Sequence, residues 1–237
     1  MQVEQLVADA ELAPRASADR PYVVANLVAS ADGRATFHGR SGELGDEGDL
    51  VMFRALRRSV DAVLVGTGTL RAEHYGRLIG DPAARRRREQ RGLAPEPLAC
   101  IFTRSGHVPV EIPLFDEPEA AVIVFGPAGL ETPDTAARVE VVGLGPDELT
   151  PPAMLRHLRG CHGVRSLLCE GGPTLLGALL ADHLVDELYL TLAPKLTGGG
   201  VGPTITSGPE LSKLITLTPE WVLERAGSLF LRYSLAV

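Results

Sequence analysis

The sequence predicts a single α/β domain with a mostly parallel central sheet, helices on its faces and an antiparallel hairpin at its C-terminal end. Three observations lead to this prediction. Short apolar runs of strand length alternate with segments of helical periodicity along most of the chain. The 237 residues, 45% of them hydrophobic, are enough to fill one core. The last two apolar runs, 221–226 and 229–236, flank Gly227-Ser228 and suit a hairpin.

The composition limits the classes of function. A formal net charge of −7 argues against a general nucleic-acid or membrane surface. Cys100, Cys161 and Cys169 have no C-x-x-C spacing, so we expect reduced packing residues. No basic leader precedes an apolar segment, and no apolar run reaches membrane-spanning length. We therefore expect a cytoplasmic enzyme or binding protein.

The elements follow in order along the chain. Residues 1–19 are mixed and polar and suit an arm, which leaves 20–237 as the domain. Residues 22–29 predict a buried strand, and helical periodicity begins at Asp46. The strand at 61–66 leads into a glycine turn that has Arg71 where a dinucleotide-binding motif needs its third glycine. Further strands are expected at 98–103, 121–125, 139–142, 164–169 and 187–192, helices at 150–159 and 173–182, a solvated arginine-rich linker at 80–97, and a glycine-rich loop at 194–202.

The strongest local signal spans residues 166–177. An apolar strand meets Glu170, then Gly171 and Gly172, and Pro173 opens a helical segment. Two glycines allow close approach of a ligand, and the free N–H groups of a helix start favour a phosphate, with Thr174 adding a hydroxyl. Glu170, at the carboxyl end of its strand, could present a carboxylate to a substrate. The alternative is an ordinary strand-to-helix turn with a solvated glutamate.

Four motifs in this order carry a resemblance to a known family. They are Asn26-Leu27-Val28-Ala29-Ser30-Ala31-Asp32-Gly33, Asp61-Ala62-Val63-Leu64-Val65-Gly66-Thr67-Gly68-Thr69, Glu170-Gly171-Gly172-Pro173-Thr174-Leu175, and Val185-Asp186-Glu187-Leu188 with Pro194 and a glycine run. Over residues 20–236 the chain resembles the reductase domain of bacterial riboflavin biosynthesis. The resemblance implies a dihydrofolate-reductase-like fold, a homodimer, and NADPH-dependent reduction of the ribosyl group of 5-amino-6-(5-phosphoribosylamino)uracil to a ribityl chain.

The resemblance also implies a set of site residues. Glu170 would hold the aminouracil ring through its N–H groups, and Arg57 would bind the substrate phosphate. The other substrate contacts would be Ser41 and Arg77. Cofactor contacts would be Val28, Ala29, Thr69, Glu73, Thr103, Arg104, Ser105, Gly171, Gly172, Pro173, Thr174, Leu175 and Leu176.

Thr103, Arg104 and Ser105 suit the 2′-phosphate of NADPH. Two hydroxyls and a guanidinium follow a strand, and a guanidinium donates charge-assisted hydrogen bonds to phosphate. An NADH enzyme more often presents a carboxylate there, and none lies between Leu98 and Val110. The alternative is a loop with a surface arginine.

The chain departs from the family pattern at three places. Many family members have an Asp-Asp-Pro segment followed by Leu-Thr-x-Arg after the position of Thr69, where this chain reads Glu73-His74-Tyr75-Gly76-Arg77. Glu43 stands where an aromatic residue is common. No His-x-Glu with Pro-Cys-x-x-Cys, the signature of the zinc deaminase that often precedes the reductase, occurs in the sequence. We therefore expect the reductive step alone and no metal site.

Two other functions remain open. One is a diverged relative that reduces a folate, a pterin or another small carbonyl or imine compound, which the altered 73–77 segment favours. The other is a non-catalytic nucleotide-binding protein that keeps the phosphate turn. For the favoured function we expect direct hydride transfer from NADPH to C1′ of the ribosyl group, with the protein supplying orientation and charge.

Overall fold

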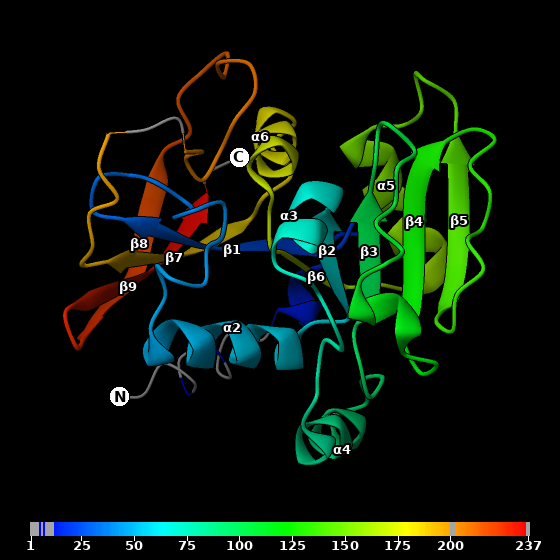
Figure 1. The fold of residues 1–237 in the computed structure, drawn as a ribbon, viewed down its shortest axis with the longest axis horizontal. Helices are drawn as coiled ribbons and strands as arrows, with labels where there is room; N and C mark the ends of the chain where they lie inside the picture. Colours follow the sequence, from blue (N-terminus) through cyan, green and yellow to red (C-terminus); the bar gives the residue numbers. More distant parts are fainter. Residues whose placement is uncertain (1–4, 6, 8–11, 200–201, 236–237) are drawn as a thin grey trace.

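The computed structural model describes residues 5, 7, 12–199 and 202–235, and within them it confirms the predicted α/β class (Figure 1). The nine strands form one sheet in the order β5-β4-β3-β2-β6-β1-β7-β9-β8. Neighbours from β5 to β7 are parallel, whereas β9 pairs antiparallel with both β7 and β8. The strands are β1 (Tyr22–Ser30), β2 (Ala62–Gly66), β3 (Leu98–Phe102), β4 (Ala121–Pro127), β5 (Arg138–Leu144), β6 (Ser166–Cys169), β7 (Glu187–Ala193), β8 (Leu217–Arg225) and β9 (Ser228–Leu235).

Helices cover both faces of the sheet. On one face Val63 packs in a cluster with Met52 and Leu56 of α2, and on the other Leu64 packs in a cluster with Leu155 of α5. Because the central strands are buried on both faces of the sheet, their sequences are continuous apolar runs. The α-helices are α2 (Glu47–Ser59), α3 (Thr67–Ala72), α4 (Pro82–Gln90), α5 (Pro151–His162) and α6 (Pro173–Ala181), and the short 3₁₀ helices are η1 (Ala13–Arg15) and η2 (Pro113–Asp116).

Local chemistry explains where helices α2 and α6 begin. Asp46 precedes α2, and its carboxylate accepts a hydrogen bond from the N–H of Asp49 at 2.9 Å, which satisfies a free donor of the first turn. Helix α6 instead begins at Pro173 with no side-chain cap. Its first N–H groups therefore remain available to a ligand.

Two expectations for connecting segments are corrected. The glycine turn after β2 continues directly into α3, and the arginine-rich stretch expected as a solvated linker contains helix α4. Asp81 starts α4 by accepting a hydrogen bond from the N–H of Ala83 at 2.9 Å. Part of the expected arm, 1–19, and part of the 194–202 loop lie outside the described residues.

Cys100 and Cys169 are buried as expected, but Cys161 is exposed on α5 and is not a packing residue. Within the described residues, no helix combines the length and the apolar character that a membrane crossing requires.

Arg88 explains why an arginine-rich stretch forms an ordered helix. Its side chain is 1% exposed and donates hydrogen bonds to the carbonyl oxygens of Arg57 and Val60 at 2.9 and 2.8 Å, and of Ala94 at 2.9 Å. The first two carbonyls belong to the C-terminal end of α2, where such groups lack partners within the helix. Desolvation lowers the pKa of Arg88 to about 10, yet it remains a cation at neutral pH. Arg88 therefore fixes the end of α2.

Replacing Arg88 should destabilise the protein much more than replacing its neighbour Arg87. Arg88→Ala leaves three carbonyls without their donor, so we expect a loss of about 2–4 kcal/mol in the free energy of unfolding. Arg87→Ala, a matched change at an exposed position of the same helix, should stay within about 0.5 kcal/mol. Urea unfolding measures both, and equal losses would show that the buried guanidinium does not anchor α2.

Candidate active site

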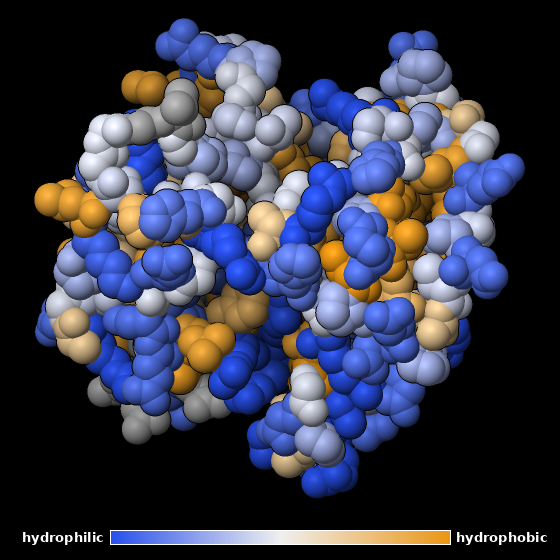
Figure 2. All heavy atoms as spheres, in the orientation of Figure 1, coloured by the Kyte–Doolittle hydropathy of each residue, from blue (hydrophilic) through white to orange (hydrophobic). Residues whose placement is uncertain are grey.

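A cavity of about 1080 Å³ opens where the carboxyl ends of β2, β3 and β6 meet α2, α3 and α6. Figure 2 shows this face of the molecule hollowed between its two halves. Ligands of open α/β sheets bind outside the carboxyl ends of the strands. The cavity is therefore the candidate active site, and residues 35–46, between β1 and α2, contribute to its wall.

Glu170 lies at the end of β6 and is held by a buried ion pair. Its Oε1 accepts a hydrogen bond from Nε of Arg57 at 2.7 Å, and its Oε2 accepts from Nη2 at 2.8 Å. The hydroxyl of Tyr75 donates to Oε2 at 2.6 Å. The side chains of Arg57 and Glu170 are 11% and 2% exposed, so water screens the pair little. Two elements far apart in the sequence thus hold one carboxylate in a fixed position.

The environment keeps both partners of Glu170 protonated. Burial alone would lower the pKa of Arg57, but the neighbouring Glu170 carboxylate raises it on balance. Burial, and next the same carboxylate, raise the pKa of Tyr75 well above its usual range. Arg57 also stacks on an aromatic ring, its guanidinium carbon lying 4.1 Å from the centroid of Phe53. Tyr75 and Arg57 therefore act as permanent donors to Glu170.

This geometry changes the role expected for Arg57. The resemblance assigns its guanidinium to the substrate phosphate, but Glu170 uses two of its nitrogens and the carbonyl of Leu78 accepts from the third at 3.3 Å. A buried carboxylate without a cation would cost several kcal/mol, which is why the pairing forms. Arg57 lines the cavity as a group that orients Glu170.

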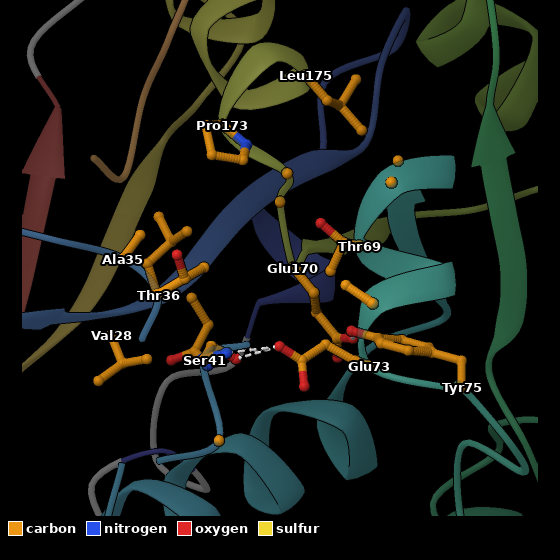
Figure 3. A pocket seen from close by; sticks show the side chains of 18 of the residues that line it. Val28, Ala35, Thr36, Ser41, Thr69, Glu73, Tyr75, Glu170, Pro173 and Leu175 are labelled. Carbon is orange, nitrogen blue, oxygen red and sulfur yellow. Dashed lines mark hydrogen bonds between the residues drawn. The ribbon is translucent and has the colours of Figure 1, made fainter. Parts of the chain in front are cut away.

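Ser41 and Glu73 form a second polar pair in the cavity. The N–H and the hydroxyl of Ser41 both donate to Oε1 of Glu73, at 2.6 and 2.9 Å, and Figure 3 shows the two residues facing each other. The pair joins the 35–46 segment to the end of α3. Glu73, assigned to the cofactor, and Ser41, assigned to the substrate, thus lie side by side.

The turn between β6 and α6 has the geometry that its glycines suggest. Gly171 has φ +88°, a conformation that favours glycine, and a Cβ on Gly172 would lie 2.9 Å from Oγ1 of Thr69. The carbonyl of Gly171 accepts from the N–H of Gly66 at 2.9 Å, which ties the turn to the end of β2. The turn therefore packs closely against α3 and the end of β2, next to the N-terminus of α6, where Figure 3 labels Pro173 and Leu175.

Thr103, Arg104 and Ser105 follow β3 at another side of the cavity. Thr103 is 2% exposed, and its hydroxyl lies 3.4 Å from that of Ser105. Arg104 is exposed, and no carboxylate among the described residues forms an ion pair with it. Its guanidinium is available to an anionic ligand.

Most of the predicted site residues line this one cavity, but three do not. Ala29 and Leu176 are 5% and 2% exposed and belong to the core. Arg77 lines a separate hollow and forms ion pairs with Glu96 and Glu119, so the structure does not bring it together with the other expected substrate contacts. The residues that do line the cavity are Val28, Ser41, Arg57, Thr69, Glu73, Thr103, Arg104, Ser105, Glu170, Gly171, Gly172, Pro173, Thr174 and Leu175.

The sequence analysis missed several polar residues of the cavity, among them Asn26, Asp49 and Tyr75. Oδ1 of Asn26 is buried and has no hydrogen-bond partner among the described residues. Asp49 accepts a hydrogen bond from the hydroxyl of Thr191 at 2.6 Å, and burial raises its pKa. Asn26 is a polar residue within the apolar run 22–29, and this was the available signal for it.

Comparison with known proteins shows the family of the chain. Residues 21–227 match the RibD C-terminal domain family. The chain is 32% identical over 197 residues to the 2,5-diamino-6-ribosylamino-4(3H)-pyrimidinone 5′-phosphate reductase of Archaeoglobus fulgidus, covering 82% of this chain and 90% of that protein. It is 29% identical to the reductase of the same name from Methanothermobacter thermautotrophicus, covering 82% and 88%.

A solved structure shares the fold over the full length of both chains. The pyrimidine reductase-like protein of Corynebacterium diphtheriae superposes with a TM-score of 0.82 at 22% sequence identity. At that identity the similarity speaks for the fold alone.

Asp49→Asn should stabilise the protein at neutral pH, because asparagine can still accept the hydrogen bond from Thr191 without a buried charge. The folded-state pKa of Asp49 is raised, so its ionisation costs stability. That cost is absent below the unfolded pKa of about 4, grows as the pH rises toward the folded pKa, and levels off above it.

The melting temperatures of the unmodified protein and of Asp49→Asn, measured between pH 4 and 8, test this pH dependence. The advantage of Asp49→Asn should be smallest near pH 4 and widen toward neutral pH, while Asp134→Asn, at an exposed position, should show no such trend. An advantage that grows toward acid would mean that the charge of Asp49 stabilises the fold.

Proposed function

Because the chain belongs to the RibD C-terminal domain family, we propose that it catalyses the NADPH-dependent reduction of the ribosyl group of 5-amino-6-(5-phosphoribosylamino)uracil to a ribityl group. One observation carries the proposal: a single cavity joins a glycine turn at a helix N-terminus to a buried, ion-paired carboxylate. The first element suits a dinucleotide phosphate, and the second suits the N–H groups of a pyrimidine ring.

The residues of the cavity fit a nicotinamide dinucleotide. The uncapped N-terminus of α6 offers free N–H groups beside Gly172, where a side chain would collide with Thr69. Thr103, Arg104 and Ser105 offer donors for a 2′-phosphate at another wall. A dinucleotide held by these residues would supply the hydride for C1′ of the substrate's open-chain ribosyl group. The chain's residues bind and orient the two reactants.

Glu170 and Asn26 are the groups we assign to the pyrimidine ring. Oε1 of Glu170 accepts one hydrogen bond within the protein and keeps a lone pair for a ring N–H, whereas Oε2 already accepts two. Oδ1 of Asn26 is a second buried acceptor with no partner among the described residues. Buried polar groups are usually hydrogen-bonded, so a ligand donor at Asn26 would complete the site.

Asp49 is the group we assign to proton supply. When a hydride adds to C1′, the imine nitrogen or aldehyde oxygen must take up a proton. The pKa of Asp49 is raised by burial, so this carboxyl holds its proton to a higher pH than an ordinary aspartate. Its position in the cavity wall suits transfer to the reacting group.

The names of two relatives favour a second substrate. The Archaeoglobus and Methanothermobacter proteins are named for a 2,5-diaminopyrimidinone, which carries an amino group where the uracil carries an oxygen. The ribosyl chemistry is the same in both compounds. The choice between them depends on donors and acceptors around the ring.

A comparison of substrates tests the proposed function. Purified protein should oxidise NADPH when offered the aminouracil phosphate or the diaminopyrimidinone phosphate, and the product should carry a ribityl chain by mass. Dihydrofolate, offered in parallel, should give a kcat/KM at least about tenfold lower, or roughly 1.4 kcal/mol. Faster turnover of dihydrofolate would favour the diverged reductase, and no turnover of any compound the non-catalytic protein.

Arg104 should set the preference for NADPH. We expect kcat/KM to favour NADPH over NADH by at least about tenfold, because a guanidinium and two hydroxyls can donate to the extra phosphate. Arg104→Ala should lower the value for NADPH and leave that for NADH, while Arg86→Ala, an exposed arginine of α4, should change neither.

Equal use of the two cofactors by the unmodified protein would contradict the assignment of the 103–105 segment. A parallel loss of NADH activity in Arg104→Ala would point to a structural role instead.

We also propose an oligomeric state for the protein. The resemblance implies a homodimer, and the edge strand β8 supports it because most of its side chains are exposed, among them Leu217 and Val222. We also propose a cytoplasmic location, the one expected for a biosynthetic reductase of this family.

A further inference from the structure

A cluster of three potential metal ligands lies outside the candidate active site. Glu140 of β5 and His157 and His162 of α5 each offer one ligand atom, and these atoms all lie within 4.8 Å of one another. None of the three lines the large cavity, and β5 is an edge strand of the sheet, separated from β6 by β4, β3 and β2. The cluster therefore needs its own explanation.

Backbone geometry brings Glu140 to α5. Val139 and Val141 of β5 pack against one core cluster, whereas Val142 packs against the cluster that contains the apolar face of α5. Side chains alternate along a strand, so Glu140 lies on the same face of the sheet as Val142. Both histidines belong to the C-terminal half of the helix that covers this face.

The Nε2 atoms of the two imidazoles make no hydrogen bonds to the described residues. Nε2 of His157 and Nε2 of His162 are both buried and have no hydrogen-bond partner among the described residues. The ring of His157 meets Phe125 edge-on at 5.5 Å between centroids, which limits its rotation. An unpartnered buried nitrogen costs free energy, and a bound cation would remove that cost.

The distance between two of the ligand atoms suits a tetrahedral ion. Nε2 of His162 lies 3.5 Å from Oε1 of Glu140. Zinc bonds of about 2.0–2.1 Å in a tetrahedron separate neighbouring ligand atoms by about 3.3 Å. The side chain of Glu140 is 55% exposed, so it can rotate to complete the geometry.

We propose that Glu140, His157 and His162 form a Zn²⁺ site that links the edge strand β5 to the C-terminal end of α5. Two imidazoles and a carboxylate match the ligands of zinc, whereas Mg²⁺ and Ca²⁺ require oxygen ligands. Three protein ligands leave the fourth position for water. The ion joins two elements that otherwise meet through apolar packing and the Glu140–His162 pair. It therefore stabilises the folded state by an amount that grows with the logarithm of the zinc concentration above Kd.

Calorimetric titration with ZnCl₂ tests the proposal. The titration uses a Cys161→Ser background, because thiols bind zinc and the thiol of Cys161 in α5 is exposed. This protein should bind one equivalent of Zn²⁺ and show a higher melting temperature with zinc, but no response to Mg²⁺. His157→Ala/His162→Ala should lose both effects. Glu140→Gln should lose at least about tenfold in affinity.

His107→Ala, which removes an exposed histidine elsewhere, should bind zinc like the background protein. Glu140→Gln changes an exposed side chain and should fold normally by circular dichroism, so its loss of affinity reports on the site itself. Unchanged stoichiometry and affinity in the double variant would show that zinc binds elsewhere. No binding heat and no thermal shift in the background protein would mean that Glu140 and His162 form only an ion pair.

Discussion

The buried ion pair between Arg57 and Glu170 is the constraint on which the site depends. A carboxylate that is 2% exposed needs a cation, and the cation comes from the last turn of α2. Arg88 in turn holds the carbonyl of Arg57, so a buried guanidinium of α4 supports the one that reaches Glu170. The end of β6, α2 and α4 are thereby joined by buried hydrogen bonds.

Most of the fold could be predicted from the sequence because its signals are local. Buried parallel strands appear as apolar runs, and the hairpin of β8 and β9 has its glycine turn in the sequence. Helix α4 could not be predicted, because the groups that bury Arg88 come from residues 28 and 31 positions away. A run of arginines alone cannot reveal which one finds carbonyl partners.

The same distinction applies to the site. The glycine turn and the place of Glu170 follow from neighbouring residues, and the structure bears out the geometry of both. The pairing of Arg57 with Glu170 spans 113 positions, and that of Tyr75 with Glu170 spans 95, so no local pattern contains them. Resemblance identified Arg57 as a site residue but gave it the phosphate, a role for which its guanidinium is already occupied.

The most direct test of this account is a double-mutant cycle of Tyr75→Phe and Glu170→Gln, read as kcat/KM for the aminouracil phosphate. If Glu170 recognises the ring and Tyr75 acts by holding Glu170, Glu170→Gln should cost about 1–3 kcal/mol of transition-state stabilisation. The two losses should then be non-additive by about 0.5–3 kcal/mol. Unchanged kinetics in Glu170→Gln, or losses that simply add, would contradict the account.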